Sequence, residues 1–165
     1  MSLAISRSTA LNIVWTGGLG LPFVIFLFRA AVDYDGWMTA IYVLFYGPLL
    51  LVISLILGVC MHSVPKTTPP TSQLWLPITG FLVWYACNIF GVGIVLSDVS
   101  DQDDFFSPLH DIIPTKYEFE IVGLILGVGA LGIIFMFVQI WRLEQKFRVP
   151  PEDQERENSA DSGCP

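Results

Sequence analysis

Residues 119–142 read FEIVGLILGVGALGIIFMFVQIWR, and this stretch decides the fold class of the chain. Between Glu120 and Arg142 it carries no ionisable side chain. An α-helix needs about 20 apolar residues to cross the hydrocarbon core of a bilayer. The stretch is therefore predicted to be a transmembrane helix.

The same stretch is rich in small residues. Glycine in a water-exposed helix costs roughly 1 kcal/mol relative to alanine, whereas in lipid it lets a neighbouring backbone come close. Gly123, Gly127 and Ala130 recur at helical spacing and share one face of the predicted helix. We predict that they form a helix-packing stripe, with a partner either inside the chain or in another subunit. Gly132 lies off this stripe, so it should tolerate a larger side chain better than Gly127.

Three further apolar stretches lie upstream, so the sequence predicts an all-α membrane protein. Its four transmembrane helices should form an antiparallel bundle, because short connections join neighbours that run in opposite directions. The predicted spans cover about residues 11–30, 37–60, 74–97 and 119–142.

The connections differ in composition. Arg29 is read as the start of a short acidic connection that ends at Gly36, the 62–73 turn contains prolines, and the 98–118 connection is the longest and most acidic. Residues 1–149 are thus one four-helix transmembrane domain. Residues 150–165 have almost no apolar side chain, which predicts a disordered acidic tail.

The composition agrees with lipid as the main partner. Of the 165 residues, 53% are hydrophobic and 14% charged, whereas a soluble domain carries about 25% charged residues. The net charge of −7 argues against nucleic acid, which needs a basic surface. We expect a multi-pass protein in a membrane that the sequence does not specify, with another membrane protein as a possible further partner.

Lysine and arginine set the expected orientation, because cytoplasmic loops carry an excess of them. The two terminal segments and the 62–73 turn hold Arg7, Lys66, Arg142, Lys146, Arg148 and Arg156. The other two connections hold Arg29 and Lys116. Both termini are therefore predicted to be cytoplasmic, with the acidic connections on the opposite side.

Neutral polar side chains occupy the second and third spans. Tyr42 and Tyr46 lie in one, and Asn88 lies in the other. Hydrogen bonding between helices explains them more simply than a ligand pocket, since polar groups often join helices in bundles. Tyr46 and Asn88 share a depth near the middle of the bilayer. We therefore predict that Asn88 faces the interior, with Tyr46 as its favoured partner.

The acidic rim supplies the only weak catalytic candidates. Asp98, Glu118 and Glu120 should reach the same side of the membrane, where carboxylates could protonate a lipophilic substrate or attract cations. The acidic run that begins at Asp98 lacks the glycine and glutamate positions of a calcium loop. A hydrated acidic loop is the simpler interpretation.

Histidine and cysteine give no further site. His62 and His110 are expected on opposite sides of the membrane, so no metal or cofactor site is predicted from them. Cys60, Cys87 and Cys164 lie in separate segments without metal-ligand spacing, and their role is left open. The leading prediction is a non-catalytic accessory or assembly subunit that acts through helix contacts. The alternatives are a small membrane enzyme at the acidic rim and a cation-handling transporter component.

Overall fold

The fold is taken from a computed structural model that describes residues 4–31, 37–96, 98–99, 105–106 and 115–148. The predicted 150–165 tail lies outside these residues. Among the described residues, four helical segments are long and apolar enough to cross a membrane. They cover Arg7–Ala31, Thr39–His62, Ser72–Val95 and Lys116–Phe147. Length and composition are those of a multi-pass membrane protein.

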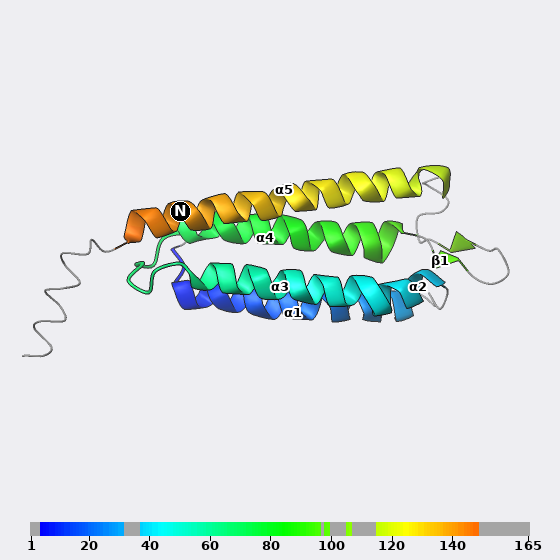
Figure 1. Ribbon diagram of the computed structural model, residues 1–165, viewed down its shortest axis with the longest axis horizontal. Coiled ribbons are helices and arrows are strands. Elements are labelled where there is room, and N and C mark those ends of the chain that lie inside the picture. Colours follow the sequence, from blue (N-terminus) through cyan, green and yellow to red (C-terminus); the bar gives the residue numbers. More distant parts are fainter. Residues whose placement is uncertain (1–3, 32–36, 97, 100–104, 107–114, 149–165) are drawn as a thin grey trace, which may run out of the picture.

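The helices lie side by side along the long axis of the molecule (Figure 1). The first is α1 (Arg7–Ala31), and the second is built from α2 (Trp37–Ile41), the π-helix η1 (Tyr42–Tyr46) and α3 (Gly47–His62). The third is built from the 3₁₀-helix η2 (Ser72–Leu74), α4 (Trp75–Asn88) and the π-helix η3 (Ile89–Val95). The fourth is α5 (Thr115–Phe147), whose 33 residues exceed the predicted span at both ends.

Between the third and fourth segments the structure has a feature that the sequence did not predict. Strands β1 (Asp98–Val99) and β2 (Phe105–Phe106) pair antiparallel, with Asp98 opposite Phe106. The predicted acidic connection therefore contains a short β-ladder. At the other end of the molecule, Ile5 forms an isolated antiparallel bridge with Thr71.

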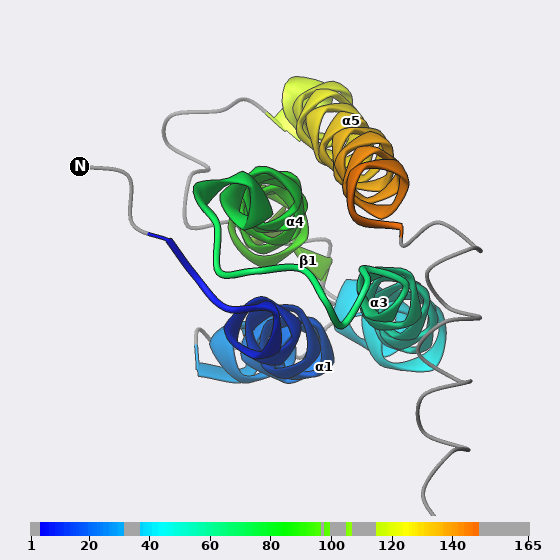
Figure 2. The same ribbon diagram turned by 90° about the vertical axis from the view of Figure 1, so that its left-hand side faces the viewer.

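The helices form two close pairs, α1 with α3 and α4 with α5, and α4 also contacts α1 (Figure 2). Hydrogen bonds between chain segments define which ends meet. Arg7, at the start of α1, donates to His62 O at the end of α3 and to Val64 O just after it, and Lys146, near the end of α5, donates to Gln73 at the start of the third segment. The start of α1 and the end of α5 thus lie at the same end of the molecule (Figure 1).

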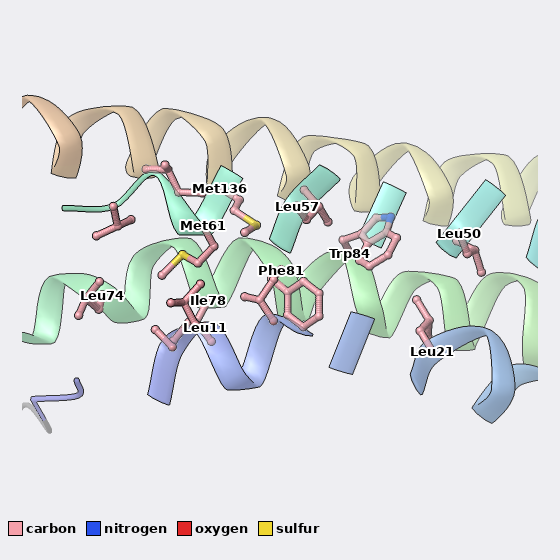
Figure 3. Packing of buried hydrophobic residues seen from close by; sticks show 14 of the residues in the cluster. Leu11, Leu21, Leu50, Leu57, Met61, Leu74, Ile78, Phe81, Trp84 and Met136 are labelled. Carbon is pink, nitrogen blue, oxygen red and sulfur yellow. The ribbon is translucent and has the colours of Figure 1, made fainter. Parts of the chain in front are cut away.

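Apolar side chains fill the space between the helices (Figure 3). The buried cluster draws on all four segments, as shown by Leu21, Leu57, Phe81 and Met136, each at most 1% exposed. The outer surface is apolar as well, with Leu124 of α5 71% exposed. A surface of this kind suits lipid as the solvent, since soluble proteins rarely expose large apolar patches.

Two prolines shape the helices in ways that the sequence explains. Pro48 has no N–H, and its ring would clash with the carbonyl of the residue four positions earlier in a regular helix. The π-helix η1 ends just before it, and the Gly47 N–H bonds to Tyr42 O, five residues back. Pro22 leaves Gly18 O without its normal donor, and Ser54 Oγ lies 2.9 Å from that oxygen. A neighbouring helix therefore supplies the missing hydrogen bond.

Candidate functional site

The polar residues predicted for the interior lie between the second and third segments. Asn88 is buried, and Tyr46 Oη donates to Asn88 Oδ1 at 2.6 Å. Asn88 Nδ2 in turn donates to Trp84 O at 2.8 Å. This is the pairing that the shared depth of the two residues predicts. It satisfies both ends of an amide that would be costly to bury without partners.

Tyr42 lies one turn away in the same π-helix and bonds to a different neighbour. Its hydroxyl donates to Pro22 O at 2.7 Å, and the residue is only 4% exposed. The rings of Tyr42 and Tyr46 pack at a tilted angle, with centroids 5.9 Å apart. The two tyrosines therefore tie the second segment to α1 and to α4, respectively.

Arg29 is the functional candidate that sequence reasoning missed. The sequence placed it at the start of a connection, but the structure places it inside α1 and fully buried. Its Nη1 donates to Val92 O at 2.8 Å and to Leu96 O at 3.2 Å, and its Nε donates to Thr39 Oγ1 at 3.1 Å. The last carbonyls of a helix have no partner within the helix and attract positive charge. Arg29 thus caps the end of η3.

The inner face of α1 contains the signal that could have located Arg29. Its buried residues recur every three or four positions and lead to position 29: Leu11, Val14, Gly18, Leu21, Ile25 and Arg29. That spacing marks one face of a helix. Because most of α1 is apolar on every side, the pattern does not stand out from the sequence alone.

The three rim carboxylates are not brought together by the described side chains. Glu118 is fully buried, whereas Glu120 is exposed. Residues two positions apart on a helix do not face each other, so the two cannot share one surface. Asp98 lies in β1, and its side chain is outside the described ones. A joint site of all three therefore gains no support.

The glycines of α5 pack on a different face from the one predicted. An added Cβ at Gly132 would lie 2.7 Å from Gly80 O, and one at Gly80 would lie 2.5 Å from Gly132 O. Among the described residues, no atom lies within 4 Å of such a Cβ at Gly123 or Gly127, and Ala130 is exposed. Within the chain, the expectation that Gly132 is the more tolerant position is therefore wrong. The Gly123, Gly127 and Ala130 stripe points outward.

The described part of the chain holds one histidine and two cysteines. His62 is exposed at the end of α3, and His110 and Cys164 lie outside the described residues. Cys60 and Cys87 are partly buried free thiols. No group of three His, Cys, Asp or Glu side chains among the described residues is placed to hold a metal ion.

The described residues form two features that bear on function, a hydrogen-bonded polar interior and an open outer face. Inside, a buried arginine, two tyrosines and an asparagine bind helix carbonyls and each other. Outside, α5 presents an uncovered stripe of small residues. Comparison of the chain with protein-family models, with curated proteins and with solved structures gives no match.

Proposed function

We propose that this chain is a non-catalytic accessory or assembly subunit that acts through helix contacts inside a membrane. In this proposal its four helices form an antiparallel bundle, with both termini and the 62–73 turn in the cytoplasm. The distribution of lysine and arginine supports the orientation, because most of these residues lie in the two terminal segments and in the 62–73 turn.

The proposal rests on the observation that α5 has two small-residue faces, of which only one packs against α4. One small-residue face, at Gly129 and Gly132, is covered by α4. The other face, at Gly123, Gly127 and Ala130, is open. Of the four apolar helices, α5 has the smallest share of buried residues in its apolar stretch, 22%. Small residues in lipid let two backbones approach and gain van der Waals contact. We assign the open face to a transmembrane helix of another membrane protein.

The polar interior supports a structural role. Tyr46 and Asn88 bond to each other, and Tyr42 and Ser54 bond to carbonyls of α1. These groups are engaged in holding helices together. A rigid bundle is what a subunit needs in order to present a fixed outer face.

Photo-crosslinking in the cell tests this assignment. A photoreactive amino acid at Leu131, which is exposed beside the stripe, should give an adduct with a second membrane protein, and Gly127→Leu should abolish that adduct. The same label at Phe23, which is exposed on α1, serves as the control and should react with lipid alone. Adducts with lipid alone at Leu131 would contradict the proposal, and an adduct of twice the chain's own mass would assign the face to a second copy.

One observation favours the alternative of a small membrane enzyme acting on a lipophilic substrate. Glu118 is fully buried near the acidic end of the bundle, and a buried ionisable group in a membrane protein is a candidate functional site. Complementation of a strain that lacks the gene separates the two functions. Glu118→Gln should be as active as Glu120→Gln if the protein is a subunit. Loss of activity in a well-expressed Glu118→Gln variant alone would favour the enzyme.

A further inference from the structure

A pocket opens between the start of the third helical segment and the end of α5, at the opposite end of the bundle from Arg29. It encloses about 230 Å³. Its lining residues come from both helices: Gln73, Leu76, Gln139, Arg142, Leu143 and Lys146. The volume lies below the roughly 300–1,000 Å³ of sites for drug-sized ligands. The pocket is therefore suited to a small group and not to a whole metabolite.

The pocket is lined by a side-chain amide that makes no hydrogen bond with the described residues. Gln139 is 7% exposed, and within the described chain its side chain makes no hydrogen bond. Its amide atoms remain accessible from the pocket, and a carboxamide can both donate and accept hydrogen bonds there. Gln139 is thus placed to donate a hydrogen bond from its NH₂ to a group in the pocket.

Two cations stand beside this amide. Arg142 and Lys146 are four residues apart on α5, so they lie on the same face, where like charges repel each other. Lys146 Nζ donates to Gln73 Oε1 at 3.0 Å. In the described part of the chain, the Arg142 guanidinium has no hydrogen bond or ion pair. An anion in the pocket would accept from all three side chains and relieve the repulsion.

The surroundings favour an anion that belongs to a lipid. Leu76 lines the pocket and is 44% exposed, and Trp75 and Trp141 are exposed beside it. Tryptophan is enriched where a membrane protein crosses from hydrocarbon to headgroups. Basic pockets between transmembrane helices bind anionic headgroups at that depth.

We propose that this pocket binds the phosphate of an anionic phospholipid. Arg142 binds two phosphate oxygens through its planar guanidinium, Lys146 neutralises charge, and Gln139 donates from the pocket floor. The lipid's acyl chains extend along Leu76 and Trp141. Basic residues near the end of a helix also interact favourably with the helix dipole, but that effect does not explain why Gln139 lines the same pocket as the two cations.

Native mass spectrometry of the full chain tests the proposal. The protein is purified from nanodiscs of phosphatidylcholine with or without phosphatidylglycerol, and retained lipid is counted. Arg142→Gln should lower phosphatidylglycerol occupancy about tenfold, the effect of losing a charge-assisted hydrogen bond. Arg148→Gln is the matched control, because Arg148 is an exposed arginine at the same helix end that does not line the pocket. It should change occupancy less than twofold.

Two further variants and one further ligand keep the result decisive. Lys146→Gln removes an exposed charge, and Gln139→Leu removes the buried amide without altering charge; both should weaken retention, with monodispersity in detergent confirming the fold. Equal loss in Arg142→Gln and Arg148→Gln would reduce the effect to surface charge and overturn the site. Inorganic phosphate that displaces phosphatidylglycerol at equal concentration would overturn the assignment to lipid. Retention of phosphatidylcholine and phosphatidylglycerol alike would overturn the assignment to an anion.

Discussion

Single side chains in the interior are matched to particular backbone oxygens. Ser54 Oγ lies within hydrogen-bonding distance of Gly18 O, the oxygen that Pro22 leaves without a donor, and of Leu50 O in its own helix. Tyr42 reaches Pro22 O. Such bonds contribute modestly in membrane proteins, because the unfolded helices also find partners. Their value lies in fixing which helix faces which.

The bond between Tyr46 and Asn88 gives the first prediction. Tyr46→Phe should lower the free energy of unfolding by about 0.6–2 kcal/mol, because it leaves Asn88 Oδ1 without a donor. Tyr85→Phe is the control: Tyr85 packs on Phe81 with centroids 6.1 Å apart and makes no hydrogen bond within the described chain, so the change should be close to zero. Unfolding by SDS in mixed micelles measures both. Equal effects would show that the hydroxyl of Tyr46 contributes nothing specific.

The two arginines of α1 give the second prediction. Arg29→Met removes two hydrogen bonds to the end of η3 in a fully buried place, so it should cost about 2–3 kcal/mol. Arg7 makes the same kind of contact with Val64 O at 2.6 Å and His62 O at 2.8 Å, but it is partly exposed. Water can replace its bonds, so Arg7→Met should cost under about 1 kcal/mol.

Thermal unfolding in detergent compares the two variants directly. A larger loss for Arg7→Met than for Arg29→Met would contradict the view that the buried arginine is the stronger cap.

The length of each helix and the positions of its irregular turns follow from the sequence. The face of each helix that packs against its neighbours is harder to predict. From Arg7 to Arg29, α1 rises roughly 33 Å, which is close to the ~30 Å thickness of the hydrocarbon core. The two arginines therefore lie near the two ends of a membrane-spanning length of helix. Pro48 explains where η1 ends. The inner face of α5 could not be predicted, because glycines occur on more than one side of that helix and the sequence does not show which side meets α4.

The close approach of α4 and α5 gives the third prediction. Gly132→Leu should lower the free energy of unfolding by about 1–3 kcal/mol or more, because the new side chain meets the backbone of Gly80, which cannot rotate away. Gly127→Leu should leave the isolated chain intact, since no atom of the described part of the chain lies within 4 Å of the added Cβ. Folded yield in detergent compares them. Loss of folded protein in Gly127→Leu alone would restore the face first predicted from the sequence.

At the scale of the whole molecule, composition predicted the four apolar helices and their order. Hydrophobic run length is a strong signal, because a bilayer demands about 20 apolar residues from every crossing helix. The strands β1 and β2 and the capping role of Arg29 were not predictable in this way, since both depend on contacts between distant segments. Of the site residues, only the pair at one depth, Tyr46 and Asn88, could be placed by counting along the helices.

We propose that all four helices cross the membrane, which places the 62–73 turn and the start of α5 on opposite sides. Cysteine labelling measures on which side each of these two segments lies. Cys60, Cys87 and Cys164 are replaced by alanine, and one new cysteine is placed at Thr67 or at Lys116, both exposed. In intact cells a membrane-impermeant maleimide should label Lys116→Cys alone, and Thr67→Cys should react only after the membrane is opened. Labelling of both positions from the same side would contradict the four-span account.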